Sequence, residues 1–276
     1  MLLIADSGST KTAWRLVNSD KYTTTGGINP FQLGTGEILN LLETEFTLPR
    51  TDITEIKFYG AGCAFPDKNK IVSDALSRYF GITGIEINSD LLAAARSLCG
   101  NRPGIACILG TGSNSCYYTG TEIAHNVSAL GYVLGDEGSG AVLGRKLLSD
   151  ILKNQLPETV RNLFFETYGL TVGEILENVY RKPFPNRYLA KFAQFVSANI
   201  NYPEIKTLAG ECFRDFFKRN VMQYEAARQL PVNLTGSISY YFSEIIKEAA
   251  EEFGLKIGKI TKEPMEGLVE YHKNNG

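Results

Sequence analysis

The sequence has few of the side chains that build metal centres. It contains five cysteines and two histidines in 276 residues, and no Cys-x-x-Cys pair. Zinc and iron–sulfur sites within one chain need such residues at close spacing. The scattered cysteines therefore argue against a metal centre of this kind, and they favour a protein whose thiols stay reduced in the cytoplasm.

Long apolar runs and a strong excess of either charge are also missing. No apolar run approaches the ~20 residues that span a bilayer, and the N-terminus lacks the basic and apolar regions of a signal peptide. The formal net charge is -2, which gives no electrostatic reason to bind nucleic acid or an anionic membrane. With 43% hydrophobic and 21% charged residues, the composition is that of an ordinary globular protein.

The P-loop pattern GxxxxGK[ST] is absent too, which excludes one common nucleotide-binding fold. The chain instead opens with the apolar run Leu2–Ala5, which predicts a strand buried on both faces and is followed by Asp6. Hydroxyls and backbone N–H groups of Ser7–Thr10 could hold phosphate oxygens, since Gly8 permits a turn with positive φ. Asp6 could face a metal that neutralises the phosphates. An ordinary Gly-Ser hairpin with an accidental Asp is the alternative.

A repeated order of elements follows. The apolar spacing predicts two further strands at 13–17 and 22–25, and then alternating helices and strands at 36–46, 56–59, 68–80, 84–87 and 91–98. The same order begins again at about residue 103, with a strand over Ile105–Leu109, the turn Gly110–Ser115 and a return strand from Cys116. We interpret this as an internal duplication of topology.

The second half also contains a long helical region. The apolar spacing predicts helices at 141–152, 157–165, 172–180, 188–200 and 205–230, the last with an aromatic stripe typical of core packing. A strand at 232–234 leads into a turn of small residues and a helix at 240–253. A strand at 256–260 and a helix at 264–271 follow, and we expect this last helix to pack on the first half of the chain.

Polar residues stand where several of these elements end. Asp90 lies where a strand stops and a helix starts. Either Ser89 or Asp90 could cap that helix, and Asp90 could also be a general base aimed into a cleft. Asn29, in a Gly-rich loop, is either a turn residue or a ligand contact. Asp136 and Glu137 lie between glycines, and either a solvated turn or a ligand or metal site would explain them.

Together these features resemble a known superfamily. The segments Asp6–Thr12, Gly110–Asn114 and Leu234–Ser237 are similar to the two phosphate motifs and the adenosine motif of the actin/hexokinase/Hsp70 ATPases. The block Leu134–Gly140 and the residues Asn88–Asp90 narrow the resemblance to the BadF/BadG/BcrA/BcrD ATPase family, on the branch that contains N-acetylglucosamine kinase. The resemblance covers essentially the whole chain.

The resemblance implies an α/β fold of two duplicated ribonuclease H-like, actin-like ATPase lobes with a cleft between them. The N-terminal lobe would comprise residues 1–102 and 262–276, and the C-terminal lobe residues 103–261 with a helical insertion. It also implies a cytoplasmic, ATP-dependent kinase that phosphorylates an amino sugar hydroxyl, at the 6-position. ATP and Mg²⁺ are then the expected cofactors, the amino sugar and ATP the expected partners, and a homodimer the expected assembly.

The resemblance further assigns roles to individual residues. Asp90 matches the catalytic base, and Asp6 matches the carboxylate that reaches Mg²⁺ through water. The positions expected to bind ATP are Ser7, Gly8, Ser9, Thr10, Lys11, Thr111, Gly112, Gly236 and Ser237. The positions expected to bind the sugar are Asn29, Asp90, Ser113, Asn114, Gly131 and Asp136.

One position departs from the family pattern. The branch often has a Trp-Gly pair before its Gly-Asp-Glu-Gly block, where this chain has Leu130 and Gly131 followed by Tyr132. The aromatic wall over the sugar is thus altered or moved to Tyr132, and glucosamine and N-acetylmuramic acid stay open as substrates.

Two other functions stay open. One is an ATPase activator of a 2-hydroxyacyl-CoA or benzoyl-CoA-type reductase or dehydratase, with an iron–sulfur cluster between subunits; the other is a non-catalytic sugar sensor.

Overall fold

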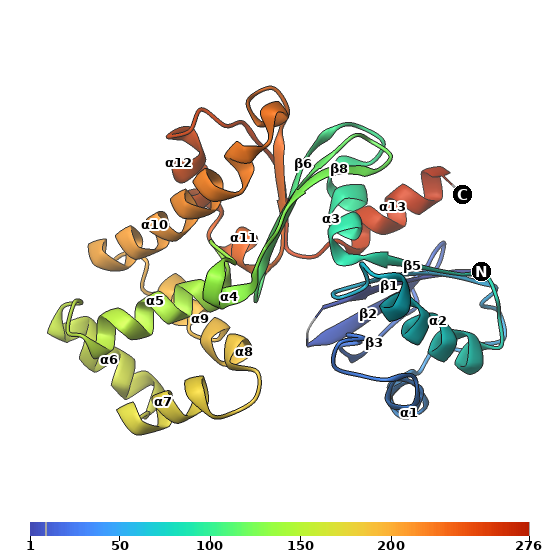
Figure 1. Ribbon diagram of the computed structural model, residues 1–276, viewed down its shortest axis with the longest axis horizontal. Coiled ribbons are helices and arrows are strands. Elements are labelled where there is room, and N and C mark those ends of the chain that lie inside the picture. Colours follow the sequence, from blue (N-terminus) through green and yellow to red (C-terminus); the bar gives the residue numbers. More distant parts are fainter. Residues whose placement is uncertain (9, 276) are drawn as a thin grey trace. The chain divides into compact units, whose positions relative to one another are not determined.

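The chain forms two compact units, each built on one five-stranded sheet (Figure 1). The computed structural model describes residues 1–8 and 10–275. The first unit contains Met1–Pro103, Tyr118–Ile123 and Glu263–Gly276, and the second contains Gly104–Tyr117 and Ala124–Lys262. Within the described residues, no helix combines the length and apolar character needed to cross a membrane.

The sheet of the first unit has its first strand in the centre. Its strands are β1 (Leu2–Ser7), β2 (Lys11–Leu16), β3 (Tyr22–Gly26), β4 (Glu55–Gly60) and β5 (Ile85–Ser89), in the order β3-β2-β1-β4-β5. Strand β2 is antiparallel to both β1 and β3, whereas β1, β4 and β5 are parallel. Four strands therefore point the same way, and their carboxyl ends meet at one edge of the sheet.

Helices cover both faces of this sheet, because β1 is apolar on both sides. The helices are α1 (Thr35–Glu45), α2 (Pro66–Phe80), α3 (Asp90–Cys99) and α13 (Met265–Asn275). Leu3 and Ala5 pack with α1 and α2 on one face, around the buried ring of Trp14. Ile4 packs with α3 and α13 on the other face. The terminal helix thus belongs to the first unit, as the sequence predicted.

The sheet of the second unit repeats this topology. Its strands are β6 (Gly104–Leu109), β7 (Ser113–Tyr118), β8 (Ile123–Val127), β9 (Val232–Thr235) and β10 (Ile257–Thr261), in the order β10-β9-β6-β7-β8. The first strand of the set is again central, its second and third strands lie on one side, and its fourth and fifth lie on the other. Strands β6, β9 and β10 are parallel. The predicted duplication is confirmed.

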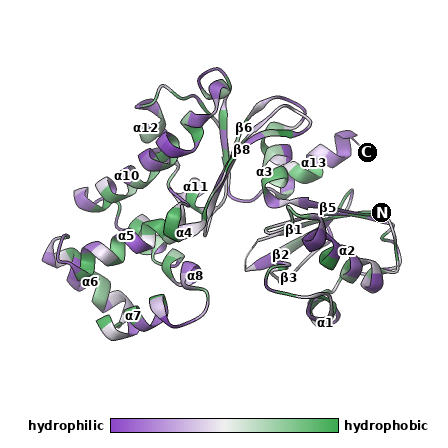
Figure 2. Cartoon of the chain, in the orientation of Figure 1, coloured by the Kyte–Doolittle hydropathy of each residue, from purple (hydrophilic) through white to green (hydrophobic). Residues whose placement is uncertain are grey.

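The remaining helices all belong to the second unit. They are α4 (Gly131–Leu134), α5 (Gly140–Leu152), α6 (Glu158–Tyr168), α7 (Val172–Tyr180), α8 (Pro185–Ala190), α9 (Ala193–Ala198), α10 (Pro203–Arg219), α11 (Ser237–Tyr241) and α12 (Ser243–Glu251), with 3₁₀ turns at Val221–Gln223 and Glu225–Arg228. Along many of them hydrophobic and hydrophilic residues alternate (Figure 2), the pattern of helices with one face in a core.

Four predicted elements differ from the observed ones. The helix predicted over 188–200 is two helices, α8 and α9, and the helix predicted over 240–253 is likewise two, α11 and α12. The helix predicted over 205–230 ends at Arg219, and side chains of the residues that follow bond to other elements. The Asn220 amide donates to Glu137 Oε2 (3.1 Å), and the Tyr224 hydroxyl donates to the Ser115 carbonyl (2.8 Å). The segment before Gly135, predicted as a loop, contains the short helix α4.

Candidate functional site

The first unit gathers several of the predicted site residues at the carboxyl edge of its sheet. Asp6 is near the end of β1, the Asn29 loop follows β3, and Asp90 follows β5 directly. Ligands of α/β sheets bind outside this edge, because backbone turns and helix starts collect there. The edge therefore brings a predicted metal carboxylate, a predicted sugar contact and a predicted base into one unit.

Asp6 and Asp90 form a pair of half-buried carboxylates. Burial, reinforced by the negative charges of Asp90 and Glu263, raises the pKa of Asp6 to about 7, although Lys11 opposes the shift. Burial also raises the pKa of Asp90, against the effect of the hydrogen bond from the Leu91 N–H (2.8 Å). A buried carboxylate whose charge is destabilised by burial and by neighbouring acids is a favourable place for a cation.

This donor set fits Mg²⁺ better than it fits a transition metal. Within the part of the chain that the structure describes, no three His, Cys, Asp or Glu side chains are grouped so that they could hold a metal ion by themselves. Mg²⁺ does not require such a cage, because it is commonly held by one or two carboxylates together with water and substrate phosphates. Asp6, with Asp90 beside it, provides carboxylates of that kind.

Asp90 is the first residue of α3, and it is not the cap of that helix. Ser89 is the N-cap, and its hydroxyl accepts the Leu92 N–H at 3.2 Å. The alternative prediction that Asp90 serves as the N-cap is therefore wrong. Because Ser89 satisfies the helix end, the Asp90 carboxylate keeps only the Leu91 N–H as a cross-residue partner within the described residues.

The first phosphate turn is partly occupied by internal bonds. The Ser7 hydroxyl is fully buried and bonds to Thr12 Oγ1 (2.8 Å) and to the backbone of Ile28, and the Ser7 carbonyl accepts the Ala61 N–H (3.0 Å). Gly8 and Thr10 are exposed, and Lys11 pairs with Glu263 (2.7 Å). Ser9, also predicted here, lies outside the described residues.

Asn29 has the turn role that was one of its two predicted roles. Its Oδ1 accepts the Phe31 N–H at 2.9 Å, and its carbonyl accepts the Gln32 and Leu33 N–H groups. Gly62 packs directly on this side chain, since a Cβ at Gly62 would lie 2.7 Å from Asn29 Oδ1. The Asn29 Nδ2 group has no partner within residues 1–8 and 10–275, so a ligand contact stays compatible with the turn.

In the second unit, the turn after β6 rests on the start of α5. The Gly110 N–H bonds to the Gly112 carbonyl, while the Gly110 and Thr111 carbonyls accept the N–H groups of Gly140 and Ala141 at 2.8 and 3.1 Å. The first amides of α5 are therefore not available to a phosphate. The N–H groups of Thr111 and Gly112 have no partner among the described residues, and they are the donors that a phosphate could use.

Asp136 braces this turn. It is buried, its Oδ1 accepts the Ser113 N–H at 3.0 Å, and a Cβ at Gly112 would lie 3.1 Å from its Oδ2. Its φ of 53° is uncommon for a residue other than glycine. Burial raises the pKa of Asp136, and the bond from Ser113 opposes the shift. The alternative of a solvated turn is wrong for this carboxylate.

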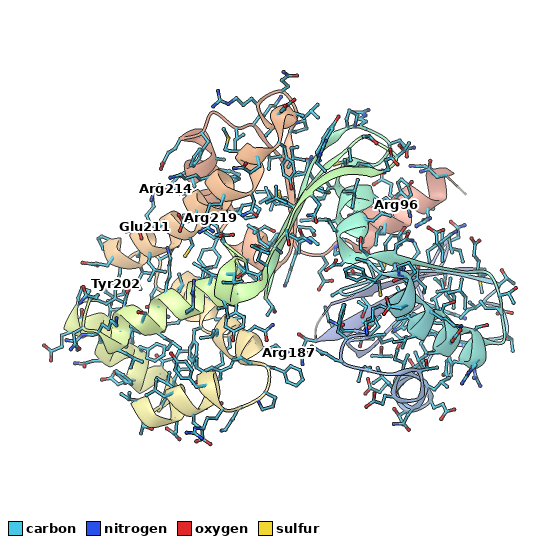
Figure 3. The ribbon with its side chains drawn as sticks, in the orientation of Figure 1. Arg96, Arg187, Tyr202, Glu211, Arg214 and Arg219 are labelled. Atoms are coloured by element: carbon cyan, nitrogen blue, oxygen red, sulfur yellow. The ribbon has the colours of Figure 1, made fainter. Side chains whose placement is uncertain are left out.

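Glu137 is held as well. Its carboxylate accepts Arg219 Nε (2.9 Å) and the Asn220 amide (3.1 Å), at the end of α10, where Figure 3 labels Arg219. The two neighbouring acids thus point to different partners. Asp136 supports the turn after β6, and Glu137 ties the same loop to α10.

Gly236 brings the predicted adenosine turn against the predicted phosphate turn. Its φ is 119°, and a Cβ there would lie 2.2 Å from the Leu109 carbonyl oxygen, so a larger residue does not fit. A Cβ at Gly140 would likewise contact the Gly110 carbonyl and Ile238 at 3.3 Å. Three turns that are far apart in sequence therefore meet within the second unit.

A cavity of about 390 Å³ opens beside Ser237. Its walls are mainly small or apolar, and they come from α8, α9 and α11: Ala190, Ala193, Gln194, Ser197, Ala198, Ser237, Ile238, Tyr241 and Phe242. Its volume lies within the roughly 300–1,000 Å³ typical of small-molecule sites. A flat, largely apolar base with a few polar edges is the kind of group that such walls accept.

The other predicted sugar contacts of the second unit have mixed surroundings. Ser113 is buried, and the Asn114 side-chain oxygen accepts the Ser115 N–H and the Asn126 amide, each at 2.9 Å. Gly131 has positive φ at the start of α4. Around it the exposed large side chains are aliphatic, namely Leu130, Val133 and Leu134, and Tyr132 is partly buried against the core.

Two residues near Asp6 and Asp90 were not predicted to be there. Glu263 follows β10, and its charge contributes to the raised pKa of Asp6. Cys63 follows β4, and burial together with the charge of Asp90 raises the pKa of its thiol to about 12. Proximity between segments so far apart in sequence leaves no local signal, apart from the rule that parallel strand ends meet.

The cysteines do not fit a cluster shared between subunits. Cys63, Cys107, Cys116 and Cys212 are buried, and Cys99 is half-buried. A cluster held between two chains needs cysteines that reach the surface on loops. The residues present therefore do not fit the iron–sulfur group that an activator of a reductase or dehydratase would carry.

Comparison with solved structures shows strong similarity to a bacterial protein. A protein from Porphyromonas gingivalis, named a "putative N-acetylglucosamine kinase", is 46% identical, with a TM-score of 0.96 over 100% of this chain and 99% of that one. The chain belongs to this N-acetylglucosamine kinase-like family. No protein-family model and no curated protein matches the sequence.

More distant structures agree with this family in fold. A protein from Chromobacterium violaceum that bears the same name is 20% identical, with a TM-score of 0.75 over 98% of each chain. A ROK hexokinase from Thermus thermophilus is 14% identical, with a TM-score of 0.57 over 100% of this chain and 99% of that one. The N-acetylglucosamine kinase-like chain therefore has the two-lobed, actin-like ATPase fold, and the predicted fold class is confirmed.

Proposed function

We propose that the protein is an ATP-dependent kinase that phosphorylates the 6-hydroxyl of N-acetylglucosamine or a closely related amino sugar. We place it in the BadF/BadG/BcrA/BcrD ATPase family. One observation carries the proposal: Asp6 and Asp90 form a coupled carboxylate pair at the ligand-binding edge of the first sheet, in a chain 46% identical to a protein named as such a kinase.

Asp90 acts as the general base in this proposal. Phosphoryl transfer to an alcohol needs a group that orients the hydroxyl and accepts its proton. Burial raises the pKa of Asp90, which makes its carboxylate a better proton acceptor. The Leu91 N–H holds one carboxylate oxygen at 2.8 Å, so the orientation of the group is set before the sugar binds.

Asp6 would hold Mg²⁺ through water, with Asp90 as the neighbouring charge. When bound, the ion neutralises the negative charge of the β- and γ-phosphates. Without a cation, burial and the negative charges of Asp90 and Glu263 raise the pKa of Asp6 to about 7. The binding of a cation by Asp6 would therefore relieve a repulsion that is built into the fold.

The nucleotide would bind through backbone groups and the cavity beside Ser237. We assign its phosphates to the N–H groups of Thr111 and Gly112, which have no partner among the described residues, and to the positions Ser7 to Lys11 that match the family pattern. We assign its adenosine to the region of Gly236 and Ser237, where the cavity measures about 390 Å³. Asp136 stabilises the Thr111 turn from behind.

We assign sugar contacts in each unit from the positions that match the family pattern. In the first unit these are Asn29, whose Nδ2 group has no partner among the described residues, and Asp90. In the second unit we assign Ser113, Asn114, Gly131 and Asp136. We further propose that the protein is a cytoplasmic homodimer, which sedimentation of the purified chain would test.

A coupled ADP-release assay tests the proposal. The sugars are N-acetylglucosamine, glucosamine, N-acetylmannosamine, N-acetylmuramic acid and glucose, and the product is analysed for phosphate at the 6-position. We expect sugar-dependent ADP release, fastest with an amino sugar, and loss of about 10²–10⁴ in kcat for Asp90→Asn. Asp74→Asn, an α2 substitution that leaves the site edge untouched, is the matched control.

Three results would contradict the proposal. Full activity of Asp90→Asn would show that Asp90 is not the general base. Sugar binding without ADP release would instead indicate a sensor. Iron in the purified protein, with the visible absorption of an iron–sulfur cluster, would favour the activator function.

A further inference from the structure

Two exposed phenylalanines stand at the ligand-binding edge of the first sheet. Phe31 is 59% exposed and Phe65 is 55% exposed, and their ring centroids lie 6.3 Å apart in an edge-to-face arrangement. Phe31 belongs to the loop after β3, and Phe65 to the loop after β4. These strands point the same way, so both loops emerge at the edge that carries Asp6 and Asp90.

Both rings sit on rigid backbone. The Phe31 N–H donates to Asn29 Oδ1 at 2.9 Å, and the Phe65 carbonyl accepts the Asn69 N–H at 2.9 Å in the first turn of α2. A Cβ at Gly62 would lie 2.9 Å from the Phe31 ring, so the two loops are in direct contact. Two solvent-exposed rings whose loops are held by hydrogen bonds are preorganised to pack against an apolar group of a ligand.

The pair is continuous with the proposed sugar site. Asn29 touches both Phe31 and Gly62. Cys63, which follows Gly62, lies close enough to Asp90 for the charge of Asp90 to raise the pKa of its thiol. Lys68 lies 4.8 Å from the Phe31 ring centroid, which covers part of that ring. The remaining aromatic surface is left beside the Asn29 amide.

We propose that Phe31 and Phe65 form the apolar wall that receives the methyl of the acceptor's 2-acetamido group, and so select N-acetylated over free amino sugars. The inference rests on the proposed kinase function. The Asn29 amide is next to this wall, which suits a substituent with a polar carbonyl and an apolar methyl. Apolar pockets discriminate a single methyl or methylene group by roughly 10–200-fold.

Substrate preference tests this wall. The variants Phe31→Ala and Phe65→Ala are assayed with N-acetylglucosamine, glucosamine and glucose. For the N-acetylated sugar we expect kcat/KM to fall about tenfold or more, mainly through KM, whereas the other two sugars change by less than about twofold. Phe31→Tyr and Phe65→Tyr should restore most of the preference, because the ring is retained.

Tyr22→Ala is the matched control. Tyr22 is also an exposed aromatic of the first unit, but it begins β3 at the opposite edge of the sheet, and its removal should leave all three sugars unchanged. Equal losses for the three sugars in the Phe variants, or no loss, would overturn the acetamido wall while leaving the kinase function standing. Absence of sugar-dependent ADP release in the wild type would overturn the kinase function, and this inference with it.

Discussion

The two units share one topology, but their acids make different contacts. In the first unit, Asp6 has neighbouring negative charges, which, together with burial, raise its pKa to about 7. In the second unit, Asp136 is held by the Ser113 N–H and packed against Gly112. Asp136 has a backbone N–H as partner, whereas negative charges face Asp6. Duplication thus supplied two similar edges, and the side-chain contacts at these edges differ.

The largest expected effect comes from exchanging these two acids for amides. Asp6→Asn should lower kcat by about 10² or more, because the carboxylate that serves Mg²⁺ is lost. The same change should raise the melting temperature of the ligand-free protein at pH 8 by about 3 °C or more, since a half-buried charge is removed. Thermal melts and ADP-release rates measure both quantities on one preparation.

Asp136→Asn is the matched variant of the second unit. It should lower the melting temperature, because the Ser113 N–H loses its charged acceptor, at a cost of about 1–3 kcal/mol. A stability gain in Asp136→Asn, or a stability loss in Asp6→Asn, would contradict the expected difference between these two carboxylates.

A glycine substitution tests how tightly the turns of the second unit are packed. Gly236→Ala should destabilise the protein by about 3 kcal/mol or more, because its Cβ would meet the Leu109 carbonyl at 2.2 Å and its φ is 119°. Gly173→Ala in α7 has open space around it, and should stabilise by about 0.4–1 kcal/mol. Urea unfolding of both variants gives the comparison, and similar values for the two would show that Gly236 is not confined.

The pH dependence should also distinguish the two edges. Asp6 has a folded pKa of about 7, above its unfolded value of about 3.9. The folded state therefore binds more protons between these values, and its stability falls as pH rises from about 4 to 7. Activity should move the other way, because Asp6 must be ionised to serve the metal, so kcat/KM should fall below about pH 7.

Melting curves across this pH range, for the wild type and Asp6→Asn, separate the contribution of Asp6 from that of every other group. The variant should lack most of the slope between pH 4 and 7. An unchanged slope would assign the effect to a different carboxyl group.

A smaller effect on stability is expected from Tyr224, in the segment that follows α10. Tyr224→Phe removes a hydroxyl that bonds to Ser115 and accepts the Val127 N–H, and should cost about 1–3 kcal/mol because buried polar partners are left unsatisfied. Tyr188→Phe is the control, since the buried Tyr188 hydroxyl has no partner in the described part of the chain, and should cost nothing measurable. Equal effects would show that the bonds of Tyr224 add nothing to stability.

Much of the architecture was predictable because it depends on local patterns. Apolar spacing predicted most strands and helices, and the repeated order of elements predicted the duplicated sheet, since each unit needs the same apolar strands in its centre. Asp90 was predictable as a site residue because a strand ends and a helix begins there. The resemblance to a kinase family depended on five such turns in order.

Other features were decided only by contacts between distant segments. The apolar spacing of 205–230 is helical throughout, yet the helix ends at Arg219. The Asn220 and Tyr224 side chains that follow bond to Glu137 and Ser115. The sequence by itself determined which segments become strands, helices and turns, because neighbouring residues set those preferences. Tertiary structure decided that Ser7 turns inward, that Asp136 braces a turn, and that Asp6 meets Asp90, because burial and the approach of charges exist only once the sheet has assembled.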